Sequence, residues 1–212
     1  RPFVDVILKA GIQEQKATRD ELIIDRTITY NDAKRGVDIH ILPSDKFRVT
    51  FMTDYKVPSL GTQYTAMYSL EEDFVDGFSP ARTFCLFSEI VQLNELGLVK
   101  GGRLDNAIVF LDREINNTEI DDLKKIFNFD KNIEAGNNGI LNGTKLRFVN
   151  EPVRHKVVDL IGDIALLGIP IRGHIIAARS GHAANVELVK KIKHTYAKKL
   201  LLRDKQRESP EI

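Results

Sequence analysis

One short segment of the chain alternates strictly between apolar and polar side chains, and this alternation constrains the fold more than any other feature. Val37, Ile39 and Ile41 share one face of the expected strand, while Asp38 and His40 lie on the other. A strand of this kind is covered on its apolar face and open to water on its polar face. The sequence therefore predicts a sheet with one buried side.

Further segments with strand character lie on both sides of it, at residues 22–24, 47–51, 64–68, 107–110 and 173–178. Turn chemistry at Asn31-Asp32, Ser44-Asp45 and Leu60-Gly61 separates the early strands. Consecutive short strands joined by turns predict a largely antiparallel sheet.

Helical periodicity marks residues 1–10, a short segment ending at Gly97, and residues 119–127, 152–167 and 183–202. The strongest of these predictions is 152–167, where Pro152 suits the first turn. Its wide apolar face is formed by Val157, Val158, Ile161, Ile164 and Ala165. Helices on one face of a mostly antiparallel sheet predict an α+β two-layer sandwich.

Charge and composition exclude several classes of protein. The 212 residues carry 31 Lys and Arg against 30 Asp and Glu, and this balance argues against a dedicated nucleic-acid binder. No apolar run approaches the roughly 20 residues of a membrane span, and no signal peptide opens the chain. Cys85 is the single cysteine, so no intramolecular disulfide forms, and we expect a cytoplasmic location.

Residues 190–203 contain six lysine or arginine side chains and no acidic one. An apolar stripe runs through this region at Val189, Ile192, Tyr196 and Leu200. The pattern favours a C-terminal helix that packs through the stripe and holds its lysines in water. A contact with a membrane surface or a polyanion is the alternative.

Two positions could carry chemistry. His155 and Asp159 are four residues apart on the best-supported helix, and Asp163 continues the row. This spacing can hold two protein positions on a catalytic zinc, but a solvated surface pair has the same spacing. Ser180 and His182 lie between a strand and a helix, where active residues are common and a capping serine is equally expected.

Several motifs together carry a resemblance. In chain order they are Ala81-Arg82-Thr83-Phe84, Gly101-Gly102 with Leu104-Asp105-Asn106-Ala107, Leu146-Arg147-Phe148, Val153-Arg154-His155-Lys156 with Asp159, Ile161-Gly162-Asp163, and Ser180-Gly181-His182-Ala183. The chain resembles the zinc-dependent UDP-3-O-acyl-N-acetylglucosamine deacetylases of lipid A biosynthesis. The likeness extends over nearly the whole chain and is clearest in residues 82–185.

The resemblance implies a domain organisation. The family consists of two similar α/β sandwiches with the active site between them, and this chain resembles the second. Residues 1–16 then correspond to the closing helix of a missing first domain, and 17–202 to the second domain. That domain carries a β-α-β insert at about 84–111 and a surface excursion at about 112–144, and residues 203–212 form a linker or tail.

The resemblance also implies chemistry. His155 and Asp159 match two zinc ligands, while the third ligand, a His, and the Glu base belong to the missing first domain. Thr83 matches the donor to the tetrahedral oxyanion. His182 matches the general acid that protonates the leaving amine, oriented by Asp163.

The implied substrate is UDP-3-O-acyl-N-acetylglucosamine. Lys156, Phe84, Arg179 and Tyr55 match positions that bind its sugar and nucleotide; Arg179 stands where the family usually has Lys. The insert would form an acyl-chain passage, lined by Phe87, Ile90, Leu93 and Val109. Cys85 and Arg103 replace smaller residues of the family pattern and leave the acyl-chain length open.

Two further implications concern partners. Some members of the family are fused at the C-terminus to a hydroxyacyl carrier-protein dehydratase, and the polar end after Arg203 suits such a junction. The alternative to an enzyme half is a non-catalytic domain of the same fold that binds a partner or a membrane surface. Retention of His155, Asp159, Asp163, Thr83 and His182 together favours the enzyme.

Overall fold

A computed structural model of the chain describes residues 1–97, 106–127 and 133–208. Six strands form its main sheet: β1 (Leu22–Ile23), β2 (Ile28–Asp32), β3 (Val37–Leu42), β4 (Phe47–Asp54), β5 (Thr62–Met67) and β8 (Ile171–Ala178). The helices around it are α1 (Pro2–Ala10), α2 (Leu70–Asp73), α5 (Glu151–Ile164), α6 (His182–Thr195) and α7 (Ala197–Glu208). Within these described ranges, no helix is long and apolar enough to cross a membrane.

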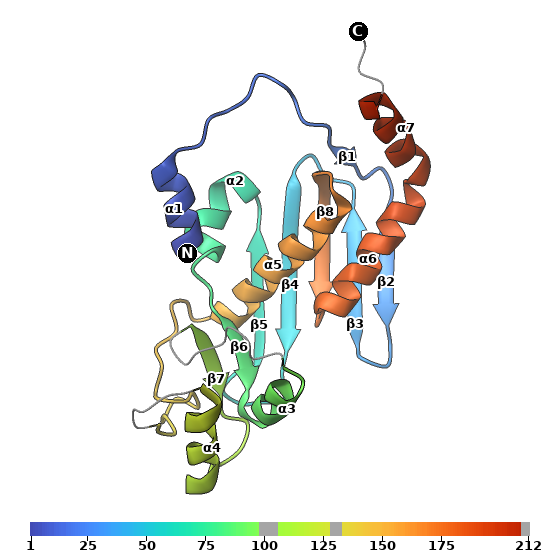
Figure 1. The fold of residues 1–212 in the computed structure, drawn as a ribbon. Coiled ribbons are helices and arrows are strands. Elements are labelled where there is room, and N and C mark those ends of the chain that lie inside the picture. Colours follow the sequence, from blue (N-terminus) through green and yellow to red (C-terminus); the bar gives the residue numbers. More distant parts are fainter. Residues whose placement is uncertain (98–105, 128–132, 209–212) are drawn as a thin grey trace.

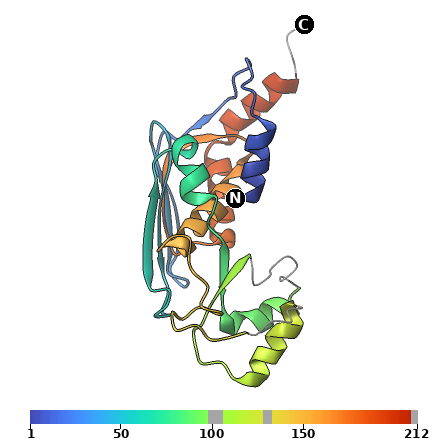
Figure 2. The ribbon, with the colours of Figure 1, turned by 90° about the vertical axis from the view of Figure 1, so that its left-hand side faces the viewer.

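The strands follow the order β2-β3-β8-β4-β5, with β1 paired to the start of β8. The pairs β2–β3, β3–β8 and β4–β5 are antiparallel, whereas β8 runs parallel to β4 and β1. Helices α5 and α6 cover one face of the sheet and leave the other face open (Figures 1 and 2). The predicted α+β two-layer sandwich is therefore confirmed, with a mixed sheet in which antiparallel pairs predominate.

The core forms between the covered face of the sheet and the apolar faces of the two long helices. Val37, Ile39 and Ile41 of β3 are buried, as their alternation predicts. Helix α5 contributes Val153, Val157, Leu160 and Ile164, and helix α6 contributes Ala184, Leu188, Val189 and Ile192. Burial of aliphatic side chains on this scale is the main favourable term for a domain of this size.

A smaller lobe projects from the sandwich and contains the predicted β-α-β insert (Figure 1). Its elements are β6 (Thr83–Leu86), α3 (Ile90–Glu95), β7 (Ala107–Phe110) and α4 (Asn117–Phe127), and β6 pairs in parallel with β7. The motif residues Gly101, Gly102, Leu104 and Asp105, and Arg103 beside them, fall outside the described residues.

The segment predicted as a surface excursion, residues 112–144, builds part of this lobe's interior. Leu123, Ile133, Ile140 and Leu141 are each at most 5% exposed. They pack against Phe87, Ile90, Val109 and Phe110 of the insert in two apolar clusters. The other described residues of this segment are exposed or half-buried, so a few apolar residues, widely spaced among Asn and Gly, supply its contacts with the lobe.

Two expectations need correction. Asn31 and Asp32 form the end of β2 rather than a turn, and the chain reverses at residues 33–36, where Asp32 accepts a hydrogen bond from the Arg35 amide. The predicted helix at 183–202 is broken at Tyr196, which separates α6 from α7. The ring of Tyr196 is buried and its hydroxyl bonds Asp25, so a tertiary contact with a distant part of the chain accompanies the break.

A buried ion pair joins the lobe to the sandwich. The Glu151 side chain, at the start of α5, is fully buried and accepts four hydrogen bonds at 2.6–3.0 Å. Three come from Arg82, just before β6, and one from the backbone amide of Arg147. Arg82 also donates to the Lys145 carbonyl. The ion pair therefore connects the segment before β6, the segment at 145–147 and the start of α5.

We expect Glu151→Gln to destabilise the folded chain, because it leaves the Arg82 guanidinium buried without a counter-charge. Removing one partner of a buried ion pair typically costs about 3 kcal/mol or more in unfolding free energy. Urea denaturation followed by circular dichroism measures the change. Glu114→Gln, at an exposed position on the same lobe, is the matched control and should leave the unfolding free energy within about 0.5 kcal/mol.

The pH dependence of this difference has a definite sign. Burial raises the pKa of the Glu151 carboxyl, but hydrogen bonds from Arg82 and two backbone amides outweigh it and hold the pKa below its usual range. The stabilisation is therefore present above the unfolded-state pKa of about 4.3 and is lost as the pH falls through the folded-state value. The difference in unfolding free energy between wild type and Glu151→Gln should therefore decrease below about pH 4. A difference that stays constant from pH 7 to pH 3 would contradict the assignment.

Candidate histidine–carboxylate site

Four polar side chains converge where α5 meets the start of α6. His155, Asp159 and Asp163 lie on successive turns of α5, and His182 is the first residue of α6. His155 Nε2 lies 3.2 Å from Asp159 Oδ1, and His182 Nδ1 lies 2.9 Å from Asp163 Oδ2. His182 Nε2 is 4.0 Å from Asp159 Oδ2, which joins the two pairs into one cluster.

The hydrogen bonding of His155 determines which ring nitrogen faces the cluster. Its Nδ1 lies 3.1 Å from the carbonyl oxygen of Ala81, and a carbonyl only accepts, so Nδ1 carries the proton. In the neutral ring the lone pair of Nε2 then points at an Asp159 carboxylate oxygen. Two acceptors at 3.2 Å need a shared proton or cation between them, and a His fixed through Nδ1 in this way is typical of metal ligands.

Asp159 is held in its ionised form. Burial raises the pKa of its carboxyl, but His155, Lys156 and His182 beside it outweigh this effect, and the pKa lies below its usual range. The Asp159 and Asp163 side chains are each only 14% exposed, whereas His182 is 68% exposed. The cluster therefore has buried carboxylates and an open imidazole at its mouth.

A cation and a group of aromatic rings border the cluster. Lys156 Nζ is 3.4 Å from Asp159 Oδ2 and lies 5.6 Å from the centre of the Phe84 ring. Phe84 meets Tyr55 edge-to-face at 5.7 Å, and burial raises the pKa of the Tyr55 phenol to about 12. Thr83, exposed at the start of β6, follows Ala81 by two residues. The structure thus brings Tyr55, Thr83, Phe84 and Lys156 to the same region as the histidines.

Arg179 is directed to the β2–β3 turn. Its backbone has φ of +54°, a left-handed conformation that is uncommon for a residue with a side chain. Its amide donates to the Met52 carbonyl and its Nε donates to Gly36 O at 2.6 Å. A Cβ at position 36 would lie 3.3 Å from that Nε, so the absence of a side chain at Gly36 allows the close approach.

Three of the four side chains predicted to line an acyl passage pack together in the lobe. Phe87, Ile90 and Val109 are at most 4% exposed and share a cluster with Leu123 of α4. Leu93 is half-buried on α3. Buried apolar packing of this kind is equally expected of an ordinary hydrophobic core, so the acyl-chain passage stays a prediction.

Sequence reasoning missed one residue that contacts the site. Asn185 is buried on α6, three residues after His182, and its side-chain amide donates to Asp163. Residues three apart share a helix face, so an asparagine at this spacing from a candidate acid was the available signal.

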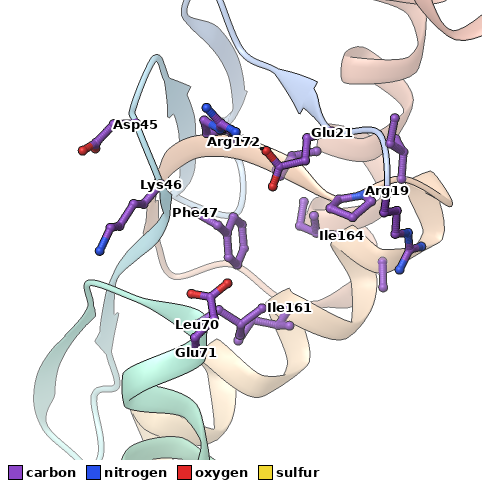
Figure 3. A pocket seen from close by; sticks show the side chains of 14 residues that line it. Arg19, Glu21, Asp45, Lys46, Phe47, Leu70, Glu71, Ile161, Ile164 and Arg172 are labelled. Atoms are coloured by element: carbon purple, nitrogen blue, oxygen red, sulfur yellow. Dashed lines mark hydrogen bonds and ion pairs between the residues drawn. The ribbon is translucent and has the colours of Figure 1, made fainter. Parts of the chain in front are cut away.

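A separate cavity of about 550 Å³ lies beside the C-terminal end of α5 (Figure 3). Its walls combine apolar side chains, among them Phe47, Leu70, Ile161 and Ile164, with the charged groups of Arg19 and Glu71. None of the histidine–carboxylate residues lines it. This cavity and the polar cluster are therefore different places on the molecule.

The metal-binding potential of the cluster is partial. His155 and Asp159 fit two ligand positions by donor type, tautomer and orientation. Over the described ranges, no group of three or more His, Cys, Asp or Glu side chains is placed to hold a metal ion. The fold and this site define a class: an α+β sandwich with a histidine–carboxylate cluster whose groups can accept and donate protons.

Comparison with known proteins places the chain within that class. The family model of the UDP-3-O-acyl N-acetylglycosamine deacetylases (LpxC) matches residues 1–124 and 113–194. The chain belongs to this family.

Three relatives illustrate the similarity. The chain is 45% identical over 208 residues to the bifunctional enzyme LpxC/FabZ of Chlorobaculum tepidum, covering 98% of this chain and 44% of the relative. It is 36% identical over 191 residues to the UDP-3-O-acyl-N-acetylglucosamine deacetylase of Chlamydia trachomatis serovar L2, covering 90% and 57%. For the bifunctional LpxC/FabZ of Bacteroides thetaiotaomicron the identity is 35% over 191 residues, covering 90% and 41%. The chain spans about half the length of these curated relatives.

Proposed function

We propose that the chain is the second half of a zinc-dependent deacetylase. The full-length enzyme would remove the N-acetyl group of UDP-3-O-acyl-N-acetylglucosamine in lipid A biosynthesis. The observation that carries this proposal is the convergence of His155 and Asp159 with the His182–Asp163 pair in a chain of this family.

His155 and Asp159 would hold the zinc, together with a His from outside this chain. The proton on His155 Nδ1 is tied to the Ala81 carbonyl, which leaves Nε2 for the metal. When bound, zinc lowers the pKa of its water and polarises a carbonyl. The Glu that accepts the water's proton would also lie outside this chain, in a first domain whose closing helix corresponds to residues 1–16.

The remaining cluster residues have roles of their own. His182 would donate a proton to the leaving amine from its exposed position, while Asp163 at 2.9 Å orients the imidazole. Thr83 would donate a hydrogen bond to the oxyanion of the tetrahedral species, where charge develops. Both groups are exposed, so both are open to a substrate.

The substrate would lie along the border of the cluster. Phe84 and Tyr55 offer apolar ring surface to sugar and base, and Lys156 offers a cation to the anionic groups of a UDP-sugar. Arg179 would serve the diphosphate from its fixed place at the β2–β3 turn. An acyl chain would contact the insert near Phe87, Ile90, Leu93 and Val109. Two of the relatives are named bifunctional LpxC/FabZ enzymes, and fusion of this chain to a second enzyme, the dehydratase that the family resemblance implies, is part of the proposal.

We expect the full-length protein with His155→Ala and Asp159→Ala together to lose zinc, because two of three protein ligands are removed. Metal content by atomic emission after dialysis, and competition with a chelator, measure the change. The same two substitution types at His40 and Asp38, on the open sheet face, form the matched control and should leave the metal content unchanged. One zinc per chain at undiminished affinity in the first variant would refute the assignment.

We expect these 212 residues alone to release no acetate from the substrate, because a zinc ligand and the Glu base lie elsewhere. Incubation of the folded chain with substrate and zinc, with acetate measured enzymatically, tests this. The full-length protein at equal concentration is the positive control. Zinc-dependent acetate release by the isolated chain would contradict the partial-site proposal.

We expect His182→Ala in the full-length enzyme to lower kcat by about 10²–10⁴-fold, the usual contribution of a general acid. Zinc content and thermal stability should stay close to wild type, since the His182 side chain is 68% exposed. His194→Ala, at an exposed position on the same helix, is the matched control and should keep full activity. An unchanged rate in His182→Ala, or a loss explained by unfolding, would leave His182 with a structural role only.

A further inference from the structure

A buried hydrogen-bond chain lies behind the His182–Asp163 pair. The Asn185 side chain is 1% exposed, and its Nδ2 donates to Asp163 Oδ2 at 2.8 Å. Its Oδ1 accepts a hydrogen bond from Ser180 Oγ, also at 2.8 Å, and Ser180 is 5% exposed. The chain therefore runs from Ser180 through Asn185 to Asp163 and ends on His182.

The chemistry of Asp163 fixes the direction of every bond in this chain. An ionised carboxylate only accepts, so the NH₂ group of Asn185 must face it and the amide oxygen must face Ser180. The Ser180 hydroxyl then has to donate. Flipping the amide would place two acceptors against each other at a side chain that is only 1% exposed, so the observed orientation of the amide is the favoured one.

The pair needs this support because its imidazole is held by little else. The His182 side chain is 68% exposed, so packing does not fix its ring. The ring position depends on Asp163, whose Oδ2 receives both His182 Nδ1 and Asn185 Nδ2. Two donors from one helix, three residues apart, hold the carboxylate oxygen in place across the gap between α5 and α6.

We propose that Asn185, with Ser180 behind it, is a positioning residue that holds the Asp163 carboxylate where it meets His182. The inference rests on the proposed function, since it assigns a reaction step to that pair. Asn185 acts through Asp163 and does not touch the substrate. Its loss should therefore lower turnover and leave substrate affinity largely intact.

A purely structural role makes a different prediction. The backbone N–H of Asn185 donates to the Gly181 carbonyl in the first turn of α6. The Asn185 side chain could likewise serve only to anchor that end of the helix. In that case a substitution of Asn185 would lower the stability of the protein, and any change in kcat would be the same with and without the Asp163 carboxylate. A double-mutant cycle separates the two roles, because residues that act as one unit give non-additive effects.

The test uses the full-length zinc-loaded enzyme and four variants: Asn185→Leu, Ser180→Ala, Asp163→Ala, and Asn185→Leu combined with Asp163→Ala. We expect Asn185→Leu to lower kcat by about 10–100-fold, as loss of a supporting hydrogen bond to a functional group typically does. KM should change less than about twofold, and metal content should be retained. In the Asp163→Ala background, Asn185→Leu should have no further effect on kcat.

Val189→Ala is the matched control. Val189 is buried on the same helix, one turn further along, and contacts the core. Its truncation should reduce stability by about 1–3 kcal/mol without changing kcat. Should Asn185→Leu fail to fold, Ser180→Ala decides the question, since it removes one hydroxyl and releases the amide; we expect a several-fold fall in kcat that disappears in the Asp163→Ala background.

Two results would overturn the inference while the proposed function stands. One is a kcat within twofold of wild type in Asn185→Leu and Ser180→Ala. The other is a fall of equal size in the presence and absence of the Asp163 carboxylate. Wild-type full-length protein that releases no acetate would refute the proposed function itself, and the inference with it.

Discussion

The Glu151 carboxylate is the point on which the geometry of the site depends. It is fully buried at the start of α5 and accepts three hydrogen bonds from Arg82 and one from the Arg147 amide. Arg82 directly follows Ala81, whose carbonyl receives the Nδ1 proton of His155. A buried ion pair is costly to break because the charge that remains is not solvated by water. The pair therefore fixes the start of α5 next to the start of β6. The residues on β6 that border the cluster are positioned by the same contact.

The site is thus assembled from two rigid helices and one tethered strand. Helix α5 places His155, Asp159 and Asp163 at intervals of four residues, and α6 brings His182 and Asn185 against them. The Asp159 and Asp163 carboxylates are each 14% exposed and have cationic or hydrogen-bonding partners, while the His182 imidazole is 68% exposed. The carboxylates are therefore fixed by their partners, while the His182 imidazole stays accessible to a substrate.

The sequence predicted those features that repeat locally. Alternation placed β3, and helical spacing placed α5 and the His155–Asp159 pair. The stripe of Val189, Ile192, Tyr196 and Leu200 begins on the buried face of α6. Features that depend on distant partners were missed. The break at Tyr196 follows from its bond to Asp25, 171 residues away in the chain. Likewise, the spacing of Asn185 from His182 places the two on one face of α6, but the contact of Asn185 with Asp163 depends on how α6 packs against another helix.

The place of β8 in the sheet has a consequence for how the molecule is made. Among the described strands it comes last in chain order, yet it lies in the centre of the sheet and pairs with β1, β3 and β4. Until residue 178 has left the ribosome, β2–β3 and β4–β5 are two separate hairpins, each with an open edge where β8 belongs. Insertion of β8 is therefore a late folding step that forms contacts between residues far apart in the chain. A nascent chain that stalls before this step exposes two unpaired strand edges, which can pair with other chains and aggregate.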